Sequence, residues 1–210
     1  LTEKLIGQNI KIIAMDIDQK NINLLGQKYD TSKHQFIHGD ILKESLDFLG
    51  AKKYRIVGNL PYNISTQIIL KLVNYLNAIE DMHFLVQKEV AHRICASNHS
   101  EDWGRLGIKI SVFFQTEILF DVPPESFDIK PKVQSSFIRL IPRSTPLISM
   151  DENINFSKLI DHSFANKRKG IKNNLKKFNI DFKQLAINPL ARAEELSIEE
   201  FISIFRAISI

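Results

Sequence analysis

The stretch YRIVGNLPY, Tyr54–Tyr62, places a short apolar run, for which a strand over 54–59 is expected, directly before a proline turn. A brief apolar run that is bounded by turn residues is typical of a buried parallel strand. From Ser65 onward the apolar residues return every three or four positions, which indicates a helix. Strand, turn and helix in this order favour an open α/β sheet, whose ligands bind at the carboxyl ends of its strands.

The flanking segments repeat this alternation over the first 100 residues. Apolar runs predict three further strands, and helical spacing predicts two further helices. The strands are expected at 10–16, 35–40 and 83–86, and the helices at 21–29 and 88–96. Strands that alternate with helices in this way predict a doubly wound parallel sheet.

The remainder of the chain changes character. Strands over 117–122 and 133–141 flank a proline-rich loop and are expected to pair antiparallel, while 104–115 favours a helix. After a linker at 142–149 the pattern predicts helices only, at 156–165, 171–178 and 197–208. The sequence therefore predicts an α/β domain over residues 1–142 and a small all-helical domain over 143–210.

Composition excludes several classes of protein. The 210 residues are 44% hydrophobic and 25% charged, which is typical of a globular protein and not of a disordered chain. No apolar run reaches the roughly 18 residues that a membrane helix needs. The single cysteine excludes a disulfide framework, and the six histidines lack metal-ligand spacing, so we expect no metal and a cytoplasmic location. A net charge of +4 permits a polyanionic partner.

The residues Asn59-Leu60-Pro61-Tyr62 are suited to alkylation of the exocyclic amine of adenine. An Asn side-chain carbonyl and a nearby backbone carbonyl can each accept one N–H, which aims the lone pair of the nitrogen. Pro61 fixes φ, and Tyr62 offers a flat face on which a base can stack after it leaves its helix. The alternative is an ordinary strand-to-helix turn, in which Asn-x-Pro is common.

Two acids follow the preceding strands. Asp16 ends the first strand, where an acid of a nucleoside-binding sheet accepts hydrogen bonds from ribose hydroxyls. Asp40 ends the next strand and is suited to the exocyclic amine of a cofactor adenine. The alternative for each is a helix cap. Together with Asn59 they are expected to line one edge of one sheet.

The segment 166–177, NKRKGIKNNLKK, carries six basic residues and no acid. On a helix, Arg168, Lys172 and Lys176 would form one stripe. A charge run alone is ordinarily a solvated face, but beside an adenine site it favours contact with RNA phosphates. The residues expected to contact RNA are Arg105, Lys130, Lys132, Lys167, Arg168, Lys169, Lys172 and Lys176.

Several blocks in order resemble the small-subunit ribosomal RNA adenine dimethyltransferase family, whose loss gives kasugamycin resistance. They are GNLPYNIST, QKEVAHRI, WGRL, VPPESF with KPKVQSS, HSFANKRKGIKNNL and NPLARAEELSIEEF, and they cover nearly the whole chain. The resemblance implies a Rossmann-like class I methyltransferase that uses S-adenosylmethionine. Its substrate would be two adjacent adenines in the 3′-terminal hairpin of 16S rRNA, within the immature 30S subunit. We expect a monomer.

The resemblance also implies roles for single residues. Asp16 matches the acid that holds the cofactor ribose, and Asp40 matches the acid near the cofactor adenine. Asn59 would touch both methyl donor and acceptor amine, Leu60 would supply the backbone carbonyl, and Tyr62 would stack on the flipped adenine.

The resemblance also covers residues near both ends of the predicted α/β domain, and in two places this chain departs from the family. Phe127 matches an aromatic residue that covers the other face of the base, and Ile129 stands beside it where the family often has proline.

In the family, an acid and a loop of the type GPGxGxLT follow the first strand. Leu1-Thr2 matches the end of that loop. We therefore expect the first strand and its glycines to be missing from this sequence, and the stretch alone to bind cofactor poorly.

Two other functions stay open at this point. One is the macrolide-resistance type of enzyme, which methylates an adenine of large-subunit rRNA. That type usually has Ile after the Asn of the motif and lacks the QKEV block, whereas this chain has Leu60 and Gln87–Val90. The other is a non-catalytic ribosome-assembly or transcription factor, against which the intact Asn59–Tyr62 motif argues.

Overall fold

The computed structural model describes residues 1–8 and 10–208. Its strands form two ladders, one of two strands and one of four. In the first, β1 (Ile13–Asp16) and β2 (Gln35–His38) run parallel. In the second, the strands lie in the order β3 (Tyr54–Asn59), β4 (Ile79–Gln87), β6 (Ser135–Pro142) and β5 (Phe114–Val122). β3 and β4 are parallel. β6 is antiparallel to β5, as predicted for the two late strands, and it is also antiparallel to β4.

The helices alternate with these strands and then follow them. Those within the α/β part are α1 (Thr2–Ile6), α2 (Gln19–Lys28), α3 (Ser65–Leu72), α4 (Lys88–Ile94) and α5 (Arg105–Ser111). Short 3-10 turns lie at η1 (Asp47–Leu49), η2 (Val73–Ala78), η3 (Pro124–Ser126) and η4 (Ala193–Glu195). After β6 the described elements are helical: α6 (Asn153–Ser163), α7 (Ile171–Asn174), η4 and α8 (Ile198–Ile208).

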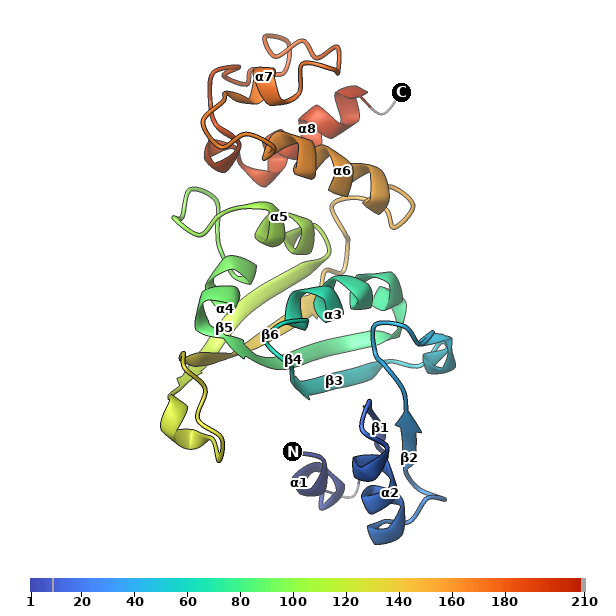
Figure 1. Cartoon of the computed structure of the whole chain (residues 1–210). Helices are drawn as coiled ribbons and strands as arrows, with labels where there is room; N and C mark the ends of the chain where they lie inside the picture. The colour runs from blue at the N-terminus through green and yellow to red at the C-terminus, as the bar shows by residue number, and fades with distance from the viewer. Residues whose placement is uncertain (9, 209–210) are drawn as a thin grey trace.

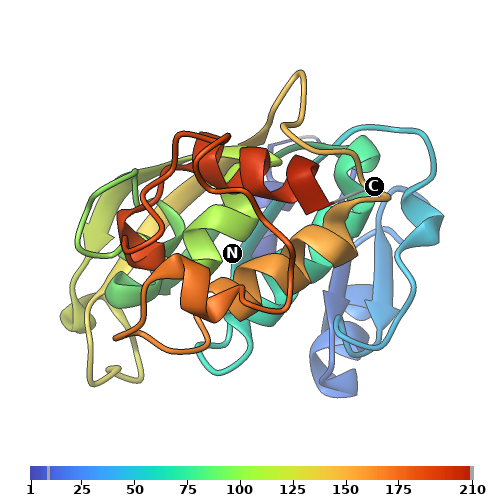
Figure 2. The same cartoon turned by 90° about the horizontal axis from the view of Figure 1, so that it is seen from above.

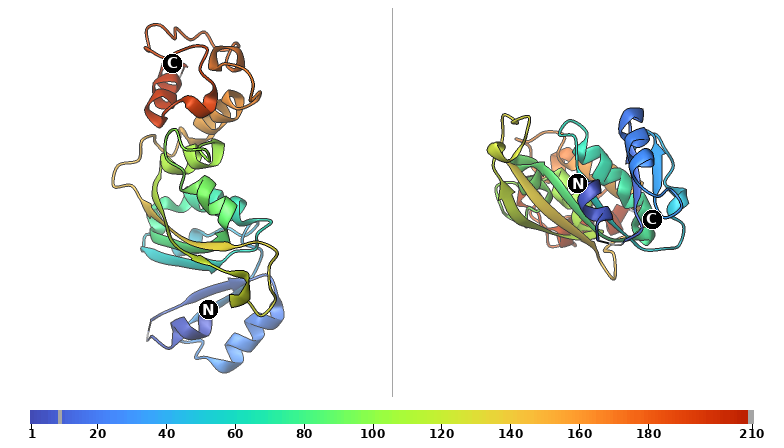
Figure 3. Two further views of the ribbon diagram at one scale, coloured as in Figure 1. Left: turned by 90° about the vertical axis from the view of Figure 1, so that its left-hand side faces the viewer. Right: turned by 90° about the horizontal axis from the view of Figure 1, so that it is seen from below.

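The molecule is elongated, with the four-stranded sheet at its centre. Figures 1 and 3 show the β1–β2 unit at one end and the C-terminal helices at the other. Helices α3, α4 and α5 lie on the side of the sheet that faces the C-terminal helices, and α6 and α8 lie over α5 (Figure 2). The pattern of β4 is consistent with helices packed on one face of the sheet, because every second residue, Met82, Phe84 and Val86, is buried.

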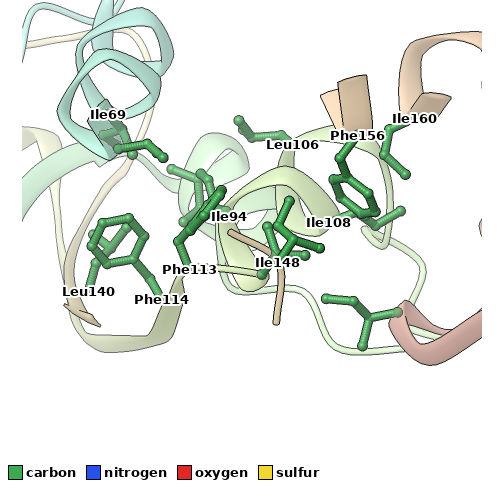
Figure 4. Packing of buried hydrophobic residues seen from close by; sticks show 14 of the residues in the cluster. Ile69, Ile94, Leu106, Ile108, Phe113, Phe114, Leu140, Ile148, Phe156 and Ile160 are labelled. Carbon is green, nitrogen blue, oxygen red and sulfur yellow. The ribbon is translucent and has the colours of Figure 1, made fainter. Parts of the chain in front are cut away.

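One continuous core joins the sheet to the C-terminal helices. Phe114 and Leu140 pack near Ile69 and Ile94 at the sheet, and Phe156 of α6 reaches Ile108 and Ile148 (Figure 4). At the far side of α6, Phe156 meets Phe205 edge-on, with ring centroids 5.4 Å apart. The C-terminal helices are therefore fixed to the sheet by apolar packing and do not hang from a flexible tether.

Two predicted helices differ from the structure. The segment 104–115 is helical only over α5, because Phe114 already pairs with Pro142 in the β5–β6 ladder. The segment 171–178 is helical only over α7, Ile171–Asn174. The predicted helix at 197–208 is confirmed. Its capping box is present, since the Glu200 amide donates to Ser197 Oγ at 3.1 Å and the Ser197 amide to Glu200 Oε2 at 2.7 Å.

Candidate active site

The turn after β3 carries the four residues of the predicted adenine site. The Leu60 amide continues the parallel ladder by donating to the Leu85 carbonyl at 3.2 Å. The Leu60 side chain is buried, whereas Asn59 and Pro61 are exposed. The Pro61 carbonyl accepts from the Ile64 amide at 3.1 Å, which closes the turn before α3 begins. A buried leucine therefore anchors a turn whose asparagine stays accessible.

Two hydrogen-bond acceptors of this turn are unused. Within residues 1–8 and 10–208, no donor bonds the side chain of Asn59 or the carbonyl of Leu60. These acceptors lie on consecutive residues at a strand end and keep free lone-pair sites, so together they can accept two N–H groups from one ligand. An amino group attached to an aromatic ring is such a ligand.

Two aromatic residues predicted to contact the adenine lie in loops, Tyr62 in the turn after β3 and Phe127 in the connection between β5 and β6. Tyr62 is half-buried, and its hydroxyl lies 2.6 Å from the Oγ atom of Ser135, the first residue of β6. Phe127, also half-buried, follows η3 in the connection that leads into β6. Among the described residues no aromatic ring stacks on either of them. A direct contact thus fixes Tyr62 at the start of β6, and Phe127 belongs to the connection that enters the same strand.

Asp16 lies at the end of β1, and each oxygen of its carboxylate accepts one hydrogen bond. Its Oδ1 accepts from the Asp18 amide at 2.8 Å and its Oδ2 from the Asn21 side chain at 2.9 Å. The cap of α2 is Asp18, which accepts from the Lys20 amide at 2.8 Å. The helix-cap alternative therefore applies to Asp18. Each oxygen of Asp16 retains a lone-pair site that suits a ribose hydroxyl.

Asp40 lies just past β2, next to Asp16. The Gly39 amide donates to the Asp16 carbonyl at 3.0 Å, which ties the two strand ends together. Asp40 Oδ1 accepts from the Leu42 amide at 2.9 Å, and Oδ2 lies 3.6 Å from Lys43 Nζ. Two carboxylates with spare acceptor capacity fit the hydroxyl and amino donors of a nucleoside such as the one in S-adenosylmethionine.

The two acids do not share a continuous sheet edge with Asn59, contrary to prediction. Asp16 and Asp40 follow β1 and β2, whereas Asn59 ends β3. Within the described part of the chain no ladder joins β1 to β3. The crossover between His38 and Tyr54 leads from the first ladder into the second, so strand pairing does not join the ends of β1 and β2 to the end of β3.

Sequence reasoning did not single out two serines that hold the site together. Ser135 and Ser136 are both fully buried in β6, where apolar residues are usual. Ser135 meets Tyr62, and Ser136 Oγ donates to Asp121 Oδ1 at 2.7 Å. The other Asp121 oxygen lies 2.5 Å from Lys88 Nζ, and this hydrogen bond holds the pKa of Asp121 below its usual range. The signal was the polar pair Ser135-Ser136 at the start of a strand that continues with mostly apolar residues.

The predicted RNA-contacting residues are all exposed, but they do not form one helical stripe. α7 spans only four residues, so Arg168 precedes it and Lys176 follows it. Gly170 is the N-cap of α7, and a Cβ there would lie 2.8 Å from the Leu190 carbonyl oxygen, so the chain enters the helix only after this close approach and Arg168 lies outside it. Among the described residues, none forms an ion pair with the exposed cations Arg105, Lys130, Lys132, Lys167, Arg168, Lys169, Lys172 and Lys176.

Trp103 lies in the loop just before Arg105, and its role is structural. It is buried, and its indole N–H donates to the Leu196 carbonyl at 2.9 Å. This contact links the start of α5 to the residue just before the cap of α8. The backbone two residues before Arg105 is thereby anchored, while Arg105 itself is exposed.

A cavity of about 640 Å³ lies away from all these residues. It opens at the amino ends of β1 and β2, between α2 and the loop that follows it, and its lining includes Lys11, Gln27 and His34. The amino ends of parallel strands are not where ligands of open α/β sheets bind. The accessible acceptors of Asn59 and the acids Asp16 and Asp40 therefore mark the site better than this cavity does.

The described residues were also searched for a metal site, a reactive thiol and a membrane helix. Among the described residues, no group of three or more His, Cys, Asp or Glu side chains could hold a metal ion. Cys95 is half-buried against the core, and burial raises the pKa of its thiol to about 11. A search of the same residues finds no helix with the length and apolar character that a membrane crossing needs.

Comparisons with known proteins show which family the chain resembles. A family model described as "Ribosomal RNA adenine dimethylase" matches residues 1–209. The chain is 39% identical over 206 residues to "Ribosomal RNA small subunit methyltransferase A" of Neisseria meningitidis serogroup C, covering 97% of this chain and 79% of that protein.

Two solved structures share the fold. A dimethyladenosine transferase from Plasmodium falciparum has a TM-score of 0.75 at 24% identity, covering 92% of this chain and 80% of that one. The 23S rRNA methyltransferase ErmE has a TM-score of 0.69 at 20% identity, covering 95% of this chain and 82% of that one. At these identities the likeness is one of fold.

Proposed function

This chain belongs to the ribosomal RNA adenine dimethylase family, and from that membership we propose how its residues carry out the reaction. It is an enzyme that dimethylates adenine in ribosomal RNA with S-adenosylmethionine as methyl donor. We propose as its substrate two adjacent adenines in the 3′-terminal hairpin of 16S rRNA within the immature 30S subunit. We further propose that it acts as a monomer in the cytoplasm.

The observation that carries the catalytic assignment is the pair of unused acceptors on consecutive residues, Asn59 and Leu60. The lone pair of the adenine amine is delocalised into its ring, so the amine is a poor nucleophile. When the Asn59 side-chain oxygen and the Leu60 carbonyl each accept one N–H, the nitrogen is drawn toward tetrahedral geometry and its lone pair is aimed. Such preorganised acceptors cost no reorganisation during the reaction.

The second transfer makes a smaller demand on these acceptors. After one methyl group has been added, the amine retains one N–H, so only one of the two carbonyl oxygens can be used. The bound cofactor supplies an electrophilic methyl group, and the proton that each transfer releases goes to water. Tyr62 would hold the base in place for both rounds, with Phe127 covering its other face.

Asp16 and Asp40 are the residues we propose to hold the cofactor. Their carboxylates lie on neighbouring strand ends and keep free lone-pair sites beside the hydrogen bonds that fix them. Asp16 would accept from the ribose hydroxyls and Asp40 from the adenine amino group. Both contacts use acceptors only, which matches the donors that a nucleoside presents.

The exposed basic residues are proposed to contact RNA phosphates. Those of the C-terminal region, residues 143–210, would grip the hairpin away from the reacting base, and Arg105, Lys130 and Lys132 would do so near the site. The lack of acidic partners among the described residues supports this, because their charge is available to the backbone. Such contacts give affinity and orientation, and the adenine pocket gives selectivity.

The main competing function is methylation of large-subunit rRNA. The fold alone is compatible with it, since ErmE shares that fold. The name of the Neisseria relative and Leu60 after Asn59 favour the small subunit. Methyl transfer to purified immature 30S subunits and to 50S precursors distinguishes the two: label in the 30S rRNA alone is expected, and label in 23S rRNA alone would contradict the proposal.

The catalytic assignment is tested with Asn59→Ala. Loss of one aligned acceptor is expected to lower the rate of methyl transfer about a hundredfold, by analogy with a lost oxyanion-hole donor. Asn63→Ala is the matched control, because Asn63 is also exposed and belongs to the same turn. Initial rates on immature 30S subunits should fall for Asn59→Ala and stay near wild type for Asn63→Ala, while thermal unfolding changes little for either. Equal rates for the two variants would refute the role of Asn59.

A further inference from the structure

We propose that Ser135 is a positioning residue, whose hydroxyl holds the Tyr62 ring in the orientation in which the target adenine stacks. The inference rests on the stacking role proposed above for Tyr62. It assigns a task to the KPKVQSS block beyond the phosphate contacts proposed for its lysines. Ser135 itself would touch neither base nor cofactor.

The contact is short and comes from a rigid part of the fold. The two hydroxyl oxygens are 2.6 Å apart, at the short end of the range for O–H···O bonds, and 73 residues separate them in the sequence. Ser135 has none of its surface exposed. Its backbone pairs with Gln87 of β4 on one side and Val122 of β5 on the other. A buried hydroxyl on a strand that pairs on both sides can move little.

Tyr62, by contrast, lies in a turn that would otherwise leave its ring free to rotate. It follows Pro61 and precedes α3, and it lies outside both strand and helix. Its carbonyl accepts from Ser65 Oγ at 3.3 Å, which fixes the backbone but not χ1. A tyrosine side chain has three staggered χ1 rotamers, and a hydrogen bond at the far end of the ring selects one of them. The Ser135 contact is the one that does this.

The neighbouring serine shows that this is not a general property of the strand. Successive residues of a strand point to opposite faces, so Ser136 points away from Tyr62 and donates to Asp121 at 2.7 Å. Ser136 is as fully buried as Ser135. Replacing either serine by alanine removes one buried hydrogen bond, but only Ser135→Ala releases the ring. Ser136→Ala is therefore the matched control.

The test is a double-mutant cycle in methyl transfer. Ser135→Ala and Tyr62→Phe each remove the same hydrogen bond and keep the ring, so each is expected to lower kcat about fivefold to tenfold, the range of one hydrogen bond. The double variant should be no slower than either single variant. Ser136→Ala combined with Tyr62→Phe should instead be additive. The KM for S-adenosylmethionine should stay constant throughout, because Asp16 and Asp40 are untouched.

Each kcat is normalised to the concentration of folded enzyme and is measured well below the Tm of that variant. A loss of stability alone then does not change the rate. Additive effects of Ser135→Ala and Tyr62→Phe, or a Tyr62→Phe rate equal to wild type, would overturn the inference. If Ser135→Ala does not fold, Tyr62→Phe still tests the same bond from its other end, and a rate equal to wild type would still overturn the inference.

The same series separates this inference from the proposed function. Tyr62→Ala removes the ring itself and should be slower than Tyr62→Phe. If Tyr62→Ala is as active as wild type, the stacking role fails. If Tyr62→Ala is inactive while Tyr62→Phe matches wild type, the stacking role holds and only the assignment of Ser135 fails.

Discussion

At the scale of single residues, paired charges contribute most where one partner is withdrawn from water. Asp81 has 12% of its side chain exposed and accepts two hydrogen bonds from Arg55, each 2.7 Å long, across the β3–β4 ladder. These bonds, chiefly, hold the pKa of Asp81 below its ordinary value of 3.8, and His83 and Arg139 add to the effect. Glu3 and Lys28 form a pair of similar length, 2.6 Å, but both are more than half exposed. Water screens that second pair.

Asp81 is expected to make the stability of the fold depend on pH at its acid end. Because the folded pKa is lowered, the contribution is complete above the unfolded pKa and is lost as the pH falls through the folded value. Asp81→Asn should therefore lower the free energy of unfolding by roughly 1–2 kcal/mol at pH 7, allowing for the exposure of Arg55. The difference from wild type should shrink below about pH 4. Urea unfolding at pH 7, 5, 4 and 3 measures it.

Glu3→Gln is the control for this experiment. Its pair is exposed to solvent, so the variant should unfold like wild type at each pH. A gap between wild type and Asp81→Asn that is constant from pH 7 to pH 3 would show that the carboxylate acts by shape and not by charge.

At the scale of elements, the point at which a helix begins can be set by contacts that the sequence pattern does not contain. The basic segment 166–177 has helical spacing throughout, yet α7 begins only at Ile171, after its N-cap Gly170. Gly170 approaches the backbone of Leu190 so closely that a Cβ would lie 2.8 Å from its carbonyl oxygen. Gly170 has φ −61° and ψ 157°, which any residue can adopt, so the requirement for glycine is one of space. Local periodicity cannot reveal an approach between residues 20 positions apart.

Gly170→Ala is expected to destabilise the protein because its neighbour is backbone and cannot move aside cheaply. The cost should be about 1–3 kcal/mol, the range for overpacking a closely packed site. Gly26→Ala is the matched control. Gly26 lies in α2, the nearest atom to a Cβ there is 4.0 Å away, and alanine favours a helix interior by roughly 0.5–1 kcal/mol. Thermal unfolding midpoints should move in opposite directions, and a shift of both in one direction would contradict this account.

What the sequence can predict at this scale follows the strength of local signals. β3 has the bounds that its residues predict, because apolar residues and a proline turn mark the strand and its end. The capping box of α8 is predicted from Ser197 and Glu200 and is present. The bond between Tyr62 and Ser135 could not be predicted, since only the fold brings residues 73 positions apart together.

At the scale of the whole molecule, the arrangement of the two ladders is beyond local prediction. Each strand end is located from its own residues, but a shared sheet edge depends on which strands pair, and β1 pairs with β2 while β3 pairs with β4. The elongated shape follows from this, with the β1–β2 unit and the basic segment at opposite ends (Figure 1). The separation lets charge be removed from either end without disturbing the other.

Charge at the C-terminal end is expected to govern how RNA affinity depends on salt. Lys167, Arg168 and Lys169 are exposed and, within the described residues, have no acidic partner. Replacing all three by alanine should flatten the plot of log affinity against log salt by roughly 2–3 units, at about 0.7–0.9 for each phosphate that the variant no longer neutralises. Cofactor affinity should stay constant, because Asp16 and Asp40 lie at the other end of the molecule. Titration of the hairpin RNA at several salt concentrations gives the slope.

The control for this titration removes the same number of charges from the N-terminal end. Lys4, Lys20 and Lys28 are exposed, and Lys28 already has a partner in Glu3. Their triple alanine variant has the net charge of the first triple variant, so an effect of overall charge alone would change both slopes equally. A phosphate contact made by the segment 167–169 changes only the first. Equal slopes for the two variants would mean that other cations, such as Arg105, Lys130 and Lys132, hold the RNA.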